Sequence, residues 1–265
     1  MNRLKNIFSK LVSAVSPPPP PLRLRVLEKH ETFSADPKRL EVIAPGFWPE
    51  LKHLDGFLCH EVKHLSVDGL PYTWREAVRF EAALMGELGL SRQGAHCLLN
   101  AVADVVVNLR SAAAGVNVKA AVEEWLRRYP VTPEVEGTVY HLLQIIYKEL
   151  FKVRLKKTRY EAWVRQKPEF RQLMSVLKRL EARCGSLNRE NLSELIVEAS
   201  RLFLMLARLD MPKEYSDAMD DIDFNRDDPE VRREAVKAGL DNGLMSNQVE
   251  DLTGSKGEGK VEELI

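Results

Sequence analysis

Helical periodicity over most of the chain is the feature that most restricts its fold. From residue 50 to residue 209, apolar side chains recur every three or four positions, and proline or glycine marks most junctions. This pattern predicts helices over residues 50–65, 73–88, 91–113, 118–129, 133–153, 168–183 and 189–209. The side chains expected to cap helix N-termini are Thr73, Ser91, Thr132 and Asn188. We therefore expect a mainly α-helical fold.

The residues before this helical region predict a linker and a small sheet. Pro17 to Pro21 form an unbroken proline run, which adopts extended polyproline structure and acts as a stiff spacer. Apolar and polar residues then alternate over residues 22–28 and, less regularly, over 39–44, which predicts two short strands. Residues 1–16 are amphipathic, and a frayed terminus is favoured there over a helix that docks on a membrane surface or a partner.

These boundaries divide the chain into four parts. An amphipathic segment and linker occupy residues 1–21, a main domain 22–153, a helical extension 154–210 and a tail 211–265. The tail is first acidic and then rich in glycine, serine and lysine. We therefore expect it to be poorly ordered, apart from a short helix over residues 229–239.

The overall charge gives no argument for nucleic-acid binding. The 39 basic and 39 acidic side chains cancel, so no nucleic-acid partner is expected. Basic residues gather over 154–167 beside Tyr160 and Trp163, but at neutral overall charge a solvated helix face or linker is favoured there. The cysteines are scattered singly, which suits a reducing interior and a cytoplasmic protein. No segment approaches the roughly 20 apolar residues of a membrane span.

The stretch FLCHEVKHLS, residues 57–66, holds the first half of a candidate metal site. His60 and His64 are four positions apart, so on a helix they lie on the same face and can present ring nitrogens to one metal ion. In zinc hydrolases with the spacing H-E-x-x-H, the histidines are ligands and the glutamate, here Glu61, is the base that takes a proton from water. Without metal, the histidines would be ordinary polar core residues and Glu61 would be solvated.

A polar stripe in the helix expected over 91–113 supplies the third ligand that such a site needs. In this strongly apolar segment the polar exceptions follow one another at steps of four, as His96, Asn100, Asp104 and Asn108. Burying an unpaired ionised aspartate is costly, and a metal held by the facing helix would offset that cost. We expect Asp104 to be the third ligand, Asn100 and Asn108 to orient ligands by hydrogen bonds, and His96 to be peripheral. A polar seam satisfied by backbone and water is the alternative.

Three segments of the chain together resemble a known zinc-metallopeptidase family. They are HEVKH, NAVADVVVN and, after a turn at Gly115, TPEVEGTVYHLL. The family is often joined to a von Willebrand A-like domain and encoded near AAA ATPases. The similarity covers residues 54–150 and implies a zincin-like metallopeptidase domain with an AAA ATPase as partner. It also implies Zn²⁺ held by His60, His64 and Asp104, Glu61 as general base, and Asn108 as a structural neighbour.

The chain departs from that family in two ways, which makes it a divergent relative. A whole extra helix, TWREAVRFEAALMGEL, separates His64 from Asp104, and helices up to residue 209 replace the von Willebrand A-like domain. Gluzincins of the membrane-protease type resemble the chain in another register, with E-x-x-x-D on the helix over 91–113. That register would put Asn100 at the ligand position, which is chemically poor for zinc. Asp104 remains the expected ligand.

The resulting prediction is a zinc metallopeptidase that hydrolyses peptide bonds of a peptide or protein substrate. Tyr140 and His141 are candidates for stabilising the oxyanion, although core packing with a hydroxyl bonded to backbone is favoured for Tyr140. A D-G turn explains Asp68 better than a ligand role does. The competing classes are a non-catalytic, zinc-stabilised helical module that docks an AAA ATPase or another protein, and a helical interaction domain without metal.

Overall fold

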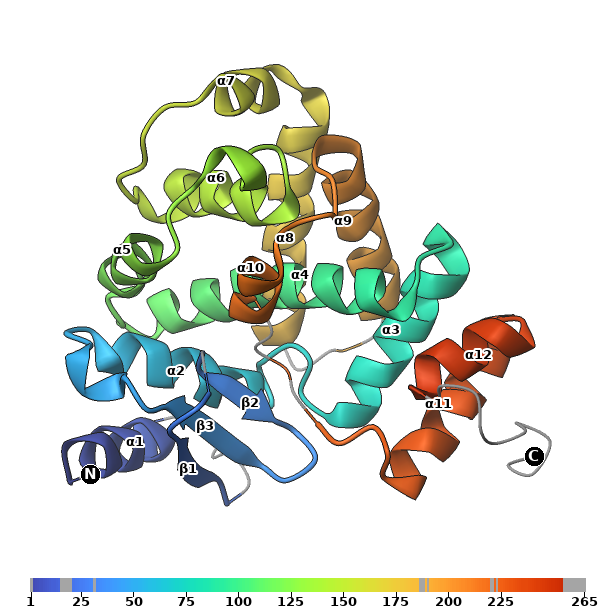
Figure 1. Ribbon diagram of the computed structural model, residues 1–265, viewed down its shortest axis with the longest axis horizontal. Coiled ribbons are helices and arrows are strands. Elements are labelled where there is room, and N and C mark those ends of the chain that lie inside the picture. Colours follow the sequence, from blue (N-terminus) through green and yellow to red (C-terminus); the bar gives the residue numbers. More distant parts are fainter. Residues whose placement is uncertain are drawn as a thin grey trace.

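Helices dominate the part of the chain that the structure describes. The structure is a computed structural model, and it describes residues 2–14, 21–30, 32–185, 189, 191–219, 222 and 224–254. A small sheet lies on the N-terminal side of the helices (Figure 1). The expected mainly α-helical fold is confirmed. Within the described ranges, no helix combines the length and the apolar character needed to cross a membrane.

The sheet has the strand order β1-β3-β2. β1 (Arg23–Leu27) runs parallel to β3 (Glu41–Pro45), and β2 (Ser34–Asp36) pairs antiparallel with β3. The two strands predicted from alternation are confirmed as β1 and β3. β2 was not predicted because its three residues, all buried, are too few to show an alternating pattern. The polyproline prediction for residues 17–20 falls outside the described residues.

The N-terminal segment forms a helix, α1 (Asn2–Ala14), that packs against α2 (Leu54–His64). Leu4 of α1 is fully buried in a cluster of apolar residues from the sheet and α2, and Phe8 and Leu11 pack against the same cluster. The expectation of a frayed terminus is therefore wrong for residues 2–14. The apolar face of this segment is covered by the chain's own α2 and sheet.

The helices predicted between residues 50 and 209 are present, with shifted ends. Besides α2 they are α3 (Trp74–Leu88), α4 (Arg92–Ala113), α5 (Val118–Arg128), α6 (Val139–Phe151), α8 (Pro168–Gly185) and α9 (Leu192–Leu206). Thr73 and Ser91 cap α3 and α4, because their side chains accept backbone hydrogen bonds from three residues further along. A short helix in the basic stretch, α7 (Arg159–Gln166), is anchored by the buried Val164.

The predicted N-cap at Thr132 is wrong. Thr132 precedes a short 3-10 turn, Pro133–Val135, and its side chain makes no capping bond. Gly137, with a φ of 81°, then redirects the chain, so that α6 begins only at Val139. Asn188 lies outside the described residues.

α4 is the central helix of the fold. It packs against α2, α3, α5, α6, α8 and α9 (Figure 1). The larger apolar cluster of the protein includes residues of α3, α4, α6, α8 and α9, whereas a smaller one joins α1, the sheet and one face of α2. The line along which α2 meets α4 is therefore the boundary between two apolar clusters.

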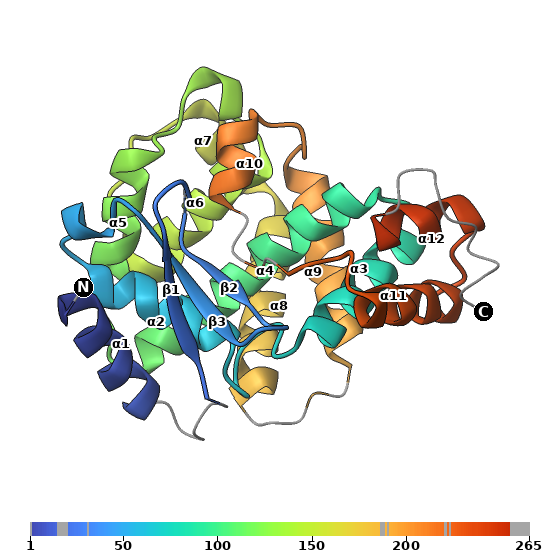
Figure 2. The same cartoon turned by 60° about the horizontal axis from the view of Figure 1, so that its bottom comes forward.

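The described part of the C-terminal region contains further helices, the last of which ends at Thr253. α10 (Lys213–Ala218), α11 (Pro229–Asp241) and α12 (Ser246–Thr253) follow α9. In Figure 2, α11 and α12 lie beside α3, at the end of the molecule away from α1. Val231, Val236 and Leu252 are buried there. The expectation of a poorly ordered tail is thus corrected for the described residues, because a few spaced apolar side chains suffice to cover α3.

Candidate metal centre

Two histidines on one face of α2 form the first half of the centre. His60 and His64 lie one helical turn apart, and their Nε2 atoms are separated by 3.0 Å. The opposite face of α2 carries Leu54, Leu58 and Val62, which are fully buried in the smaller apolar cluster. Burial of that apolar face turns the two histidines toward α4.

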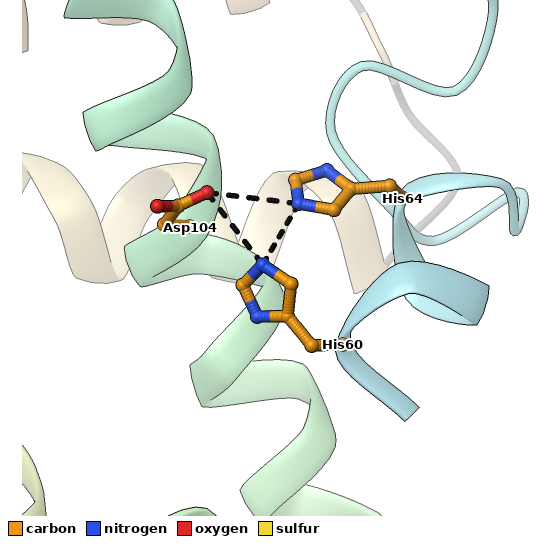
Figure 3. Close-up of side chains that lie close together, drawn as sticks. All are labelled: His60, His64 and Asp104. Carbon is orange, nitrogen blue, oxygen red and sulfur yellow. Dashed lines mark hydrogen bonds and ion pairs between the residues drawn. The ribbon is translucent and has the colours of Figure 1, made fainter. Parts of the chain in front are cut away.

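Asp104 of α4 completes the group (Figure 3). Its Oδ1 is 3.6 Å from Nε2 of His60 and 3.6 Å from Nε2 of His64. The extra helix α3 does not separate these residues, because it packs along α4, α9 and α11. The structure therefore brings together the three residues predicted as ligands.

The three donor atoms are spaced as tetrahedral coordination requires. Zinc–nitrogen and zinc–oxygen bonds of about 2.1 Å at tetrahedral angles separate two donor atoms by about 3.4 Å. The separations in this group are 3.0, 3.6 and 3.6 Å. One ion can thus be reached by all three donor atoms with small adjustments of the side chains.

The second ring nitrogen of each histidine faces an oxygen atom. His64 Nδ1 is 2.9 Å from the carbonyl oxygen of Leu70, which can only accept a hydrogen bond, so this Nδ1 donates. His60 Nδ1 is 3.1 Å from Oδ1 of Asn108, whose Nδ2 donates to the Tyr147 hydroxyl at 3.0 Å. With hydrogen on both Nδ1 atoms, the neutral rings carry their lone pairs on Nε2, which faces the carboxylate of α4.

The two Nε2 atoms and the carboxyl group of Asp104 form a buried polar cluster. The gap of 3.0 Å between the two Nε2 atoms has room for one hydrogen at most. Asp104 and Glu61 are buried carboxyl groups that line the same cavity, and Oδ1 of Asp104 has no hydrogen-bond partner among the described residues. Buried carboxylates are costly unless cations compensate them. A cation held by the three donor atoms would offset the negative charge of Asp104.

The centre faces a partly open cavity of about 70 Å³. Glu61 is only 2 % exposed and lines this cavity together with His60 and Asp104. The other lining side chains are mostly apolar and include Phe33, Phe57, Val122, Trp125, Leu126, Leu143 and Met219. A carboxylate and a group of metal-ligand atoms thus share a small apolar space.

The loop between α2 and α3 fixes the carbonyl of Leu70 that holds His64. Asp68 in this loop accepts hydrogen bonds from Lys63 Nζ at 3.0 Å and from Arg110 Nη2 at 2.8 Å. Burial alone would raise the pKa of Asp68, but these bonds hold it below its ordinary value. Asp68 thus positions the loop, in keeping with the turn that its sequence indicated.

Asn108 lies next to the centre, as predicted, whereas Asn100 and His96 lie nearer the N-terminus of α4. Asn100 Nδ2 donates to the carbonyl of Met219 at 3.0 Å, so Asn100 holds the segment after α10. His96 Nδ1 is 2.7 Å from Oε1 of Glu81, and this residue is peripheral to the centre, as expected. The stripe drifts by about 40° around α4 at each step of four residues, which turns Asn100 toward another neighbour.

The two candidates for oxyanion stabilisation are engaged in the core. Tyr140 lines the cavity, but its hydroxyl donates to the backbone carbonyl of Tyr129, and burial raises the pKa of Tyr140. His141 Nδ1 accepts a hydrogen bond from the backbone N–H of Gly137 at 3.3 Å, and burial lowers the pKa of His141. Neither side chain offers its hydrogen to the cavity in this conformation.

Two groups at the site were missed by the sequence reasoning. The contact of the Leu70 carbonyl with His64 could not be predicted, because every residue has a carbonyl and the sequence does not show which one faces a given side chain. Gln144 lines the cavity from α6, where it is a polar exception in the apolar run VYHLLQIIY. This is the same signal that identified Asp104, so Gln144 could have been noticed.

The group His60, His64 and Asp104 can hold a metal ion. No protein-family model, curated protein or solved structure matches the chain.

Proposed function

We propose that the protein is a zinc-dependent metallopeptidase. Its ligands are His60, His64 and Asp104, and Glu61 is its general base. The observation that carries this proposal is that two Nε2 atoms and one carboxylate oxygen converge, at 3.0 to 3.6 Å from one another, beside a cavity that Glu61 also lines.

Zinc is a metal that suits this donor set. Two imidazole nitrogens and one carboxylate oxygen, with a position left for water or substrate, are typical of catalytic zinc sites, whereas structural zinc sites are closed by four protein ligands. The cavity beside the three donor atoms supports an open fourth position.

The chemistry at this site is peptide-bond hydrolysis. When bound, Zn²⁺ would polarise the substrate carbonyl and lower the pKa of water. Glu61 accepts a proton from the attacking water and later donates it to the leaving amine. Asn108 and the carbonyl of Leu70 keep the two imidazole rings in the ligating tautomer. The apolar cavity wall strengthens these electrostatic interactions, because it excludes bulk water.

Metal analysis of the purified protein tests this proposal. We expect one zinc per chain in the wild type and in Glu61→Gln, and none in His60→Ala or Asp104→Asn. Cleavage of a mixture of unstructured peptides, followed by mass spectrometry, should occur with the wild type and fall by at least about 100-fold in Glu61→Gln. The His53→Ala variant is the matched control, because His53 lies in the same region outside the centre and should keep both zinc and activity.

Other results would change the conclusion in defined ways. Absence of zinc from every variant, including protein purified with added zinc, would refute the metal centre. Zinc in the wild type without any cleavage, and with no difference between wild type and Glu61→Gln, would favour the competing proposal. In that proposal the protein is a zinc-stabilised helical module that docks a partner such as an AAA ATPase.

A further inference from the structure

The loop between α2 and α3 carries the backbone carbonyl that holds His64. His64 Nδ1 donates to the carbonyl oxygen of Leu70 at 2.9 Å. Two earlier carbonyls of the same loop, those of Val67 and Gly69, accept hydrogen bonds from Arg189 at 3.0 and 3.1 Å. Arg189 lies between α8 and α9, 120 residues after Gly69 in the sequence. A guanidinium from a remote part of the chain thus contacts the loop one residue before the carbonyl that orients His64.

The guanidinium of Arg189 uses its full set of donors in these contacts. Nη1 donates to both carbonyls, Nη2 donates to Gly69 at 3.1 Å and to Oε2 of Glu76 at 2.7 Å, and Nε donates to Oε1 of Glu76 at 2.6 Å. An arginine has five N–H groups in one rigid plane, and these contacts use all of them. A lysine could not replace it, because an ammonium group has three donors and no fixed plane.

Glu76 joins the same contact to the start of α3. Its Oε2 also accepts from the backbone N–H of Tyr72 at 2.8 Å, and its own backbone N–H donates to Thr73, the N-cap of α3. The side chains of Arg189 and Glu76 are only 19 and 22 % exposed, so water screens their ion pair weakly. This ion pair therefore holds the loop both in its middle and at its end.

The loop has little freedom at the point where Arg189 holds it. A β-carbon at Gly69 would stand 1.8 Å from the carbonyl oxygen of Lys63, so only glycine lets the loop pack this closely on the end of α2. Leu70, the next residue, is fully buried. Because the two residues are adjacent and tightly packed, a shift of Gly69 moves the carbonyl of Leu70 relative to His64.

We propose that Arg189 is a positioning residue of the metal centre. It holds the loop over residues 65–73 on the path that brings the carbonyl of Leu70 to His64 Nδ1. The lone pair of His64 Nε2 then faces Asp104. Arg189 touches neither metal nor substrate and acts only through the loop. This inference rests on the proposed function, which it deepens by naming a remote residue that controls metal binding at the same site.

Zinc affinity of the full-length protein, measured by competition with a chelator, tests this inference. We expect Arg189→Met to weaken zinc binding by at least about 10-fold, since groups that orient a ligand change metal affinity by about 10- to 100-fold. Arg189→Lys keeps the positive charge but lacks the planar fork of donors, so it should weaken zinc binding by a smaller factor. Arg179→Met is the matched control. Arg179 on α8 pairs with Glu198 on α9, so its loss disturbs the same two helices without removing a contact to the loop.

The ring of His64 provides a readout that needs no metal. Nitrogen-15 NMR of the imidazole distinguishes a ring with hydrogen on Nδ1 from one with hydrogen on Nε2 alone. In the metal-free wild type and in Arg179→Met, we expect His64 to keep its hydrogen on Nδ1. In Arg189→Met, a fraction of the rings should carry hydrogen on Nε2 alone, because the acceptor at Nδ1 is no longer held in place.

A purely structural arginine would give a different result. Arg189→Met would then unfold at a lower temperature, while its zinc affinity and its His64 tautomer stayed as in the wild type, and that result would overturn the inference. Zinc affinities are compared at a temperature at which every variant is folded. If Arg189→Met does not fold, Arg189→Lys decides the matter, because equality with the wild type in zinc affinity and tautomer would also overturn the inference.

The two proposals can fail separately. If no variant holds zinc, the proposed function fails, and the His64 tautomer in metal-free wild type and Arg189→Met still decides whether Arg189 positions the ring. If zinc and Glu61-dependent cleavage are both found, while the Arg189 variants match the wild type in zinc affinity and tautomer, the metallopeptidase stands and this inference fails.

Discussion

Asn108 connects the candidate metal centre to the core of the larger helical cluster. Its Oδ1 accepts from His60 Nδ1 at 3.1 Å, and its Nδ2 donates to the Tyr147 hydroxyl of α6 at 3.0 Å. A partner of this kind fixes both the tautomer and the direction of a metal-ligating ring, although it never touches the metal. We therefore expect the metal affinity of the centre to depend on Asn108 as well as on the three proposed ligands.

Asn108→Leu should lower zinc affinity by about 10- to 100-fold and leave the protein folded. The reason is that an apolar side chain at this position no longer selects the His60 tautomer with its lone pair on Nε2. Competition with a chromophoric chelator measures the change. Asn100→Leu is the matched control, because Asn100 lies on the same helix but donates to Met219. Equal zinc affinity of the two variants would contradict the role given to Asn108.

At the scale of single residues, the sequence was sufficient to predict which side chains lie together wherever helical spacing determines their positions. His60 and His64 had to share a face once the segment was helical, and Asp104 stood out as an anionic residue in an apolar helix. The carbonyl of Leu70 depends on the path of a loop, and no residue pattern encodes that path. The contacts of Asn100 depend on where the segment after α10 lies, which helical periodicity does not specify.

Among the elements, α3 and α4 are tied together by a buried ionic cluster. Oε1 of Glu81 on α3 is 2.7 Å from His96 Nδ1 on α4 and 2.6 Å from Arg226 Nη2, which precedes α11. Glu81 is fully buried, and burial alone would raise its pKa, yet Arg226 and His96 together lower the pKa of Glu81 to about 2. The cluster joins three parts of the chain that are remote in sequence.

This cluster predicts a specific loss of stability in acid. The pKa of Glu81 falls from its ordinary 4.5 to about 2 in the folded protein, so its contribution is complete above pH 4.5 and is lost as the pH falls toward 2. The difference corresponds to about 3 kcal/mol. We expect Glu81→Gln to lower the free energy of unfolding by about 3 kcal/mol at pH 7 and by progressively less below pH 4.5, as measured by urea unfolding.

A carboxylate at the exposed end of the same helix provides the control for this prediction. Glu87 is also on α3 and is exposed, so Glu87→Gln should change the free energy of unfolding by no more than about 0.5 kcal/mol at any pH. A difference in the free energy of unfolding between wild type and Glu81→Gln that stayed constant from pH 7 to pH 3 would contradict the stabilising role given to the charge of Glu81.

At the scale of elements, long periodic segments were predicted well and short elements poorly. α3 and α4 combine an N-cap with a long apolar face, and both signals are local. β2 is three residues long, and α12 has few apolar residues, so neither has a strong pattern of its own. Both exist because a neighbouring element buries them, and α1 is ordered for the same reason.

On the scale of the whole molecule, the candidate centre joins the two apolar clusters. His60 and His64 belong to the helix whose other face lies in the smaller cluster, and Asp104 belongs to the central helix of the larger one. A metal bound between them would therefore cross-link two packed regions. Binding to the folded state alone stabilises a protein by about 4 kcal/mol at a ligand concentration of 1,000 times Kd.

Removal of zinc with a chelator should lower the melting temperature of the wild type and loosen the contact between the clusters. Hydrogen–deuterium exchange should rise in α2 and in the part of α4 around Asp104, while α8 and α9, which pack on each other, should change little. His60→Ala should show no response to added zinc or chelator. Identical melting curves of the wild type with and without zinc would contradict a cross-linking metal.

The turn between α3 and α4 gives the centre a further property, which concerns chain length. α3 lies between His64 and Asp104 in the sequence. The turn that connects α3 to α4 contains Gly89, an exposed residue with a φ of 66°. Nothing lies within 4 Å of the place where a side chain at Gly89 would stand. Each doubling of a flexible loop costs only about 0.6 kcal/mol, so residues could be inserted at this turn while both halves of the centre keep their positions. The geometry of the centre therefore does not fix the number of residues between H-E-x-x-H and Asp104.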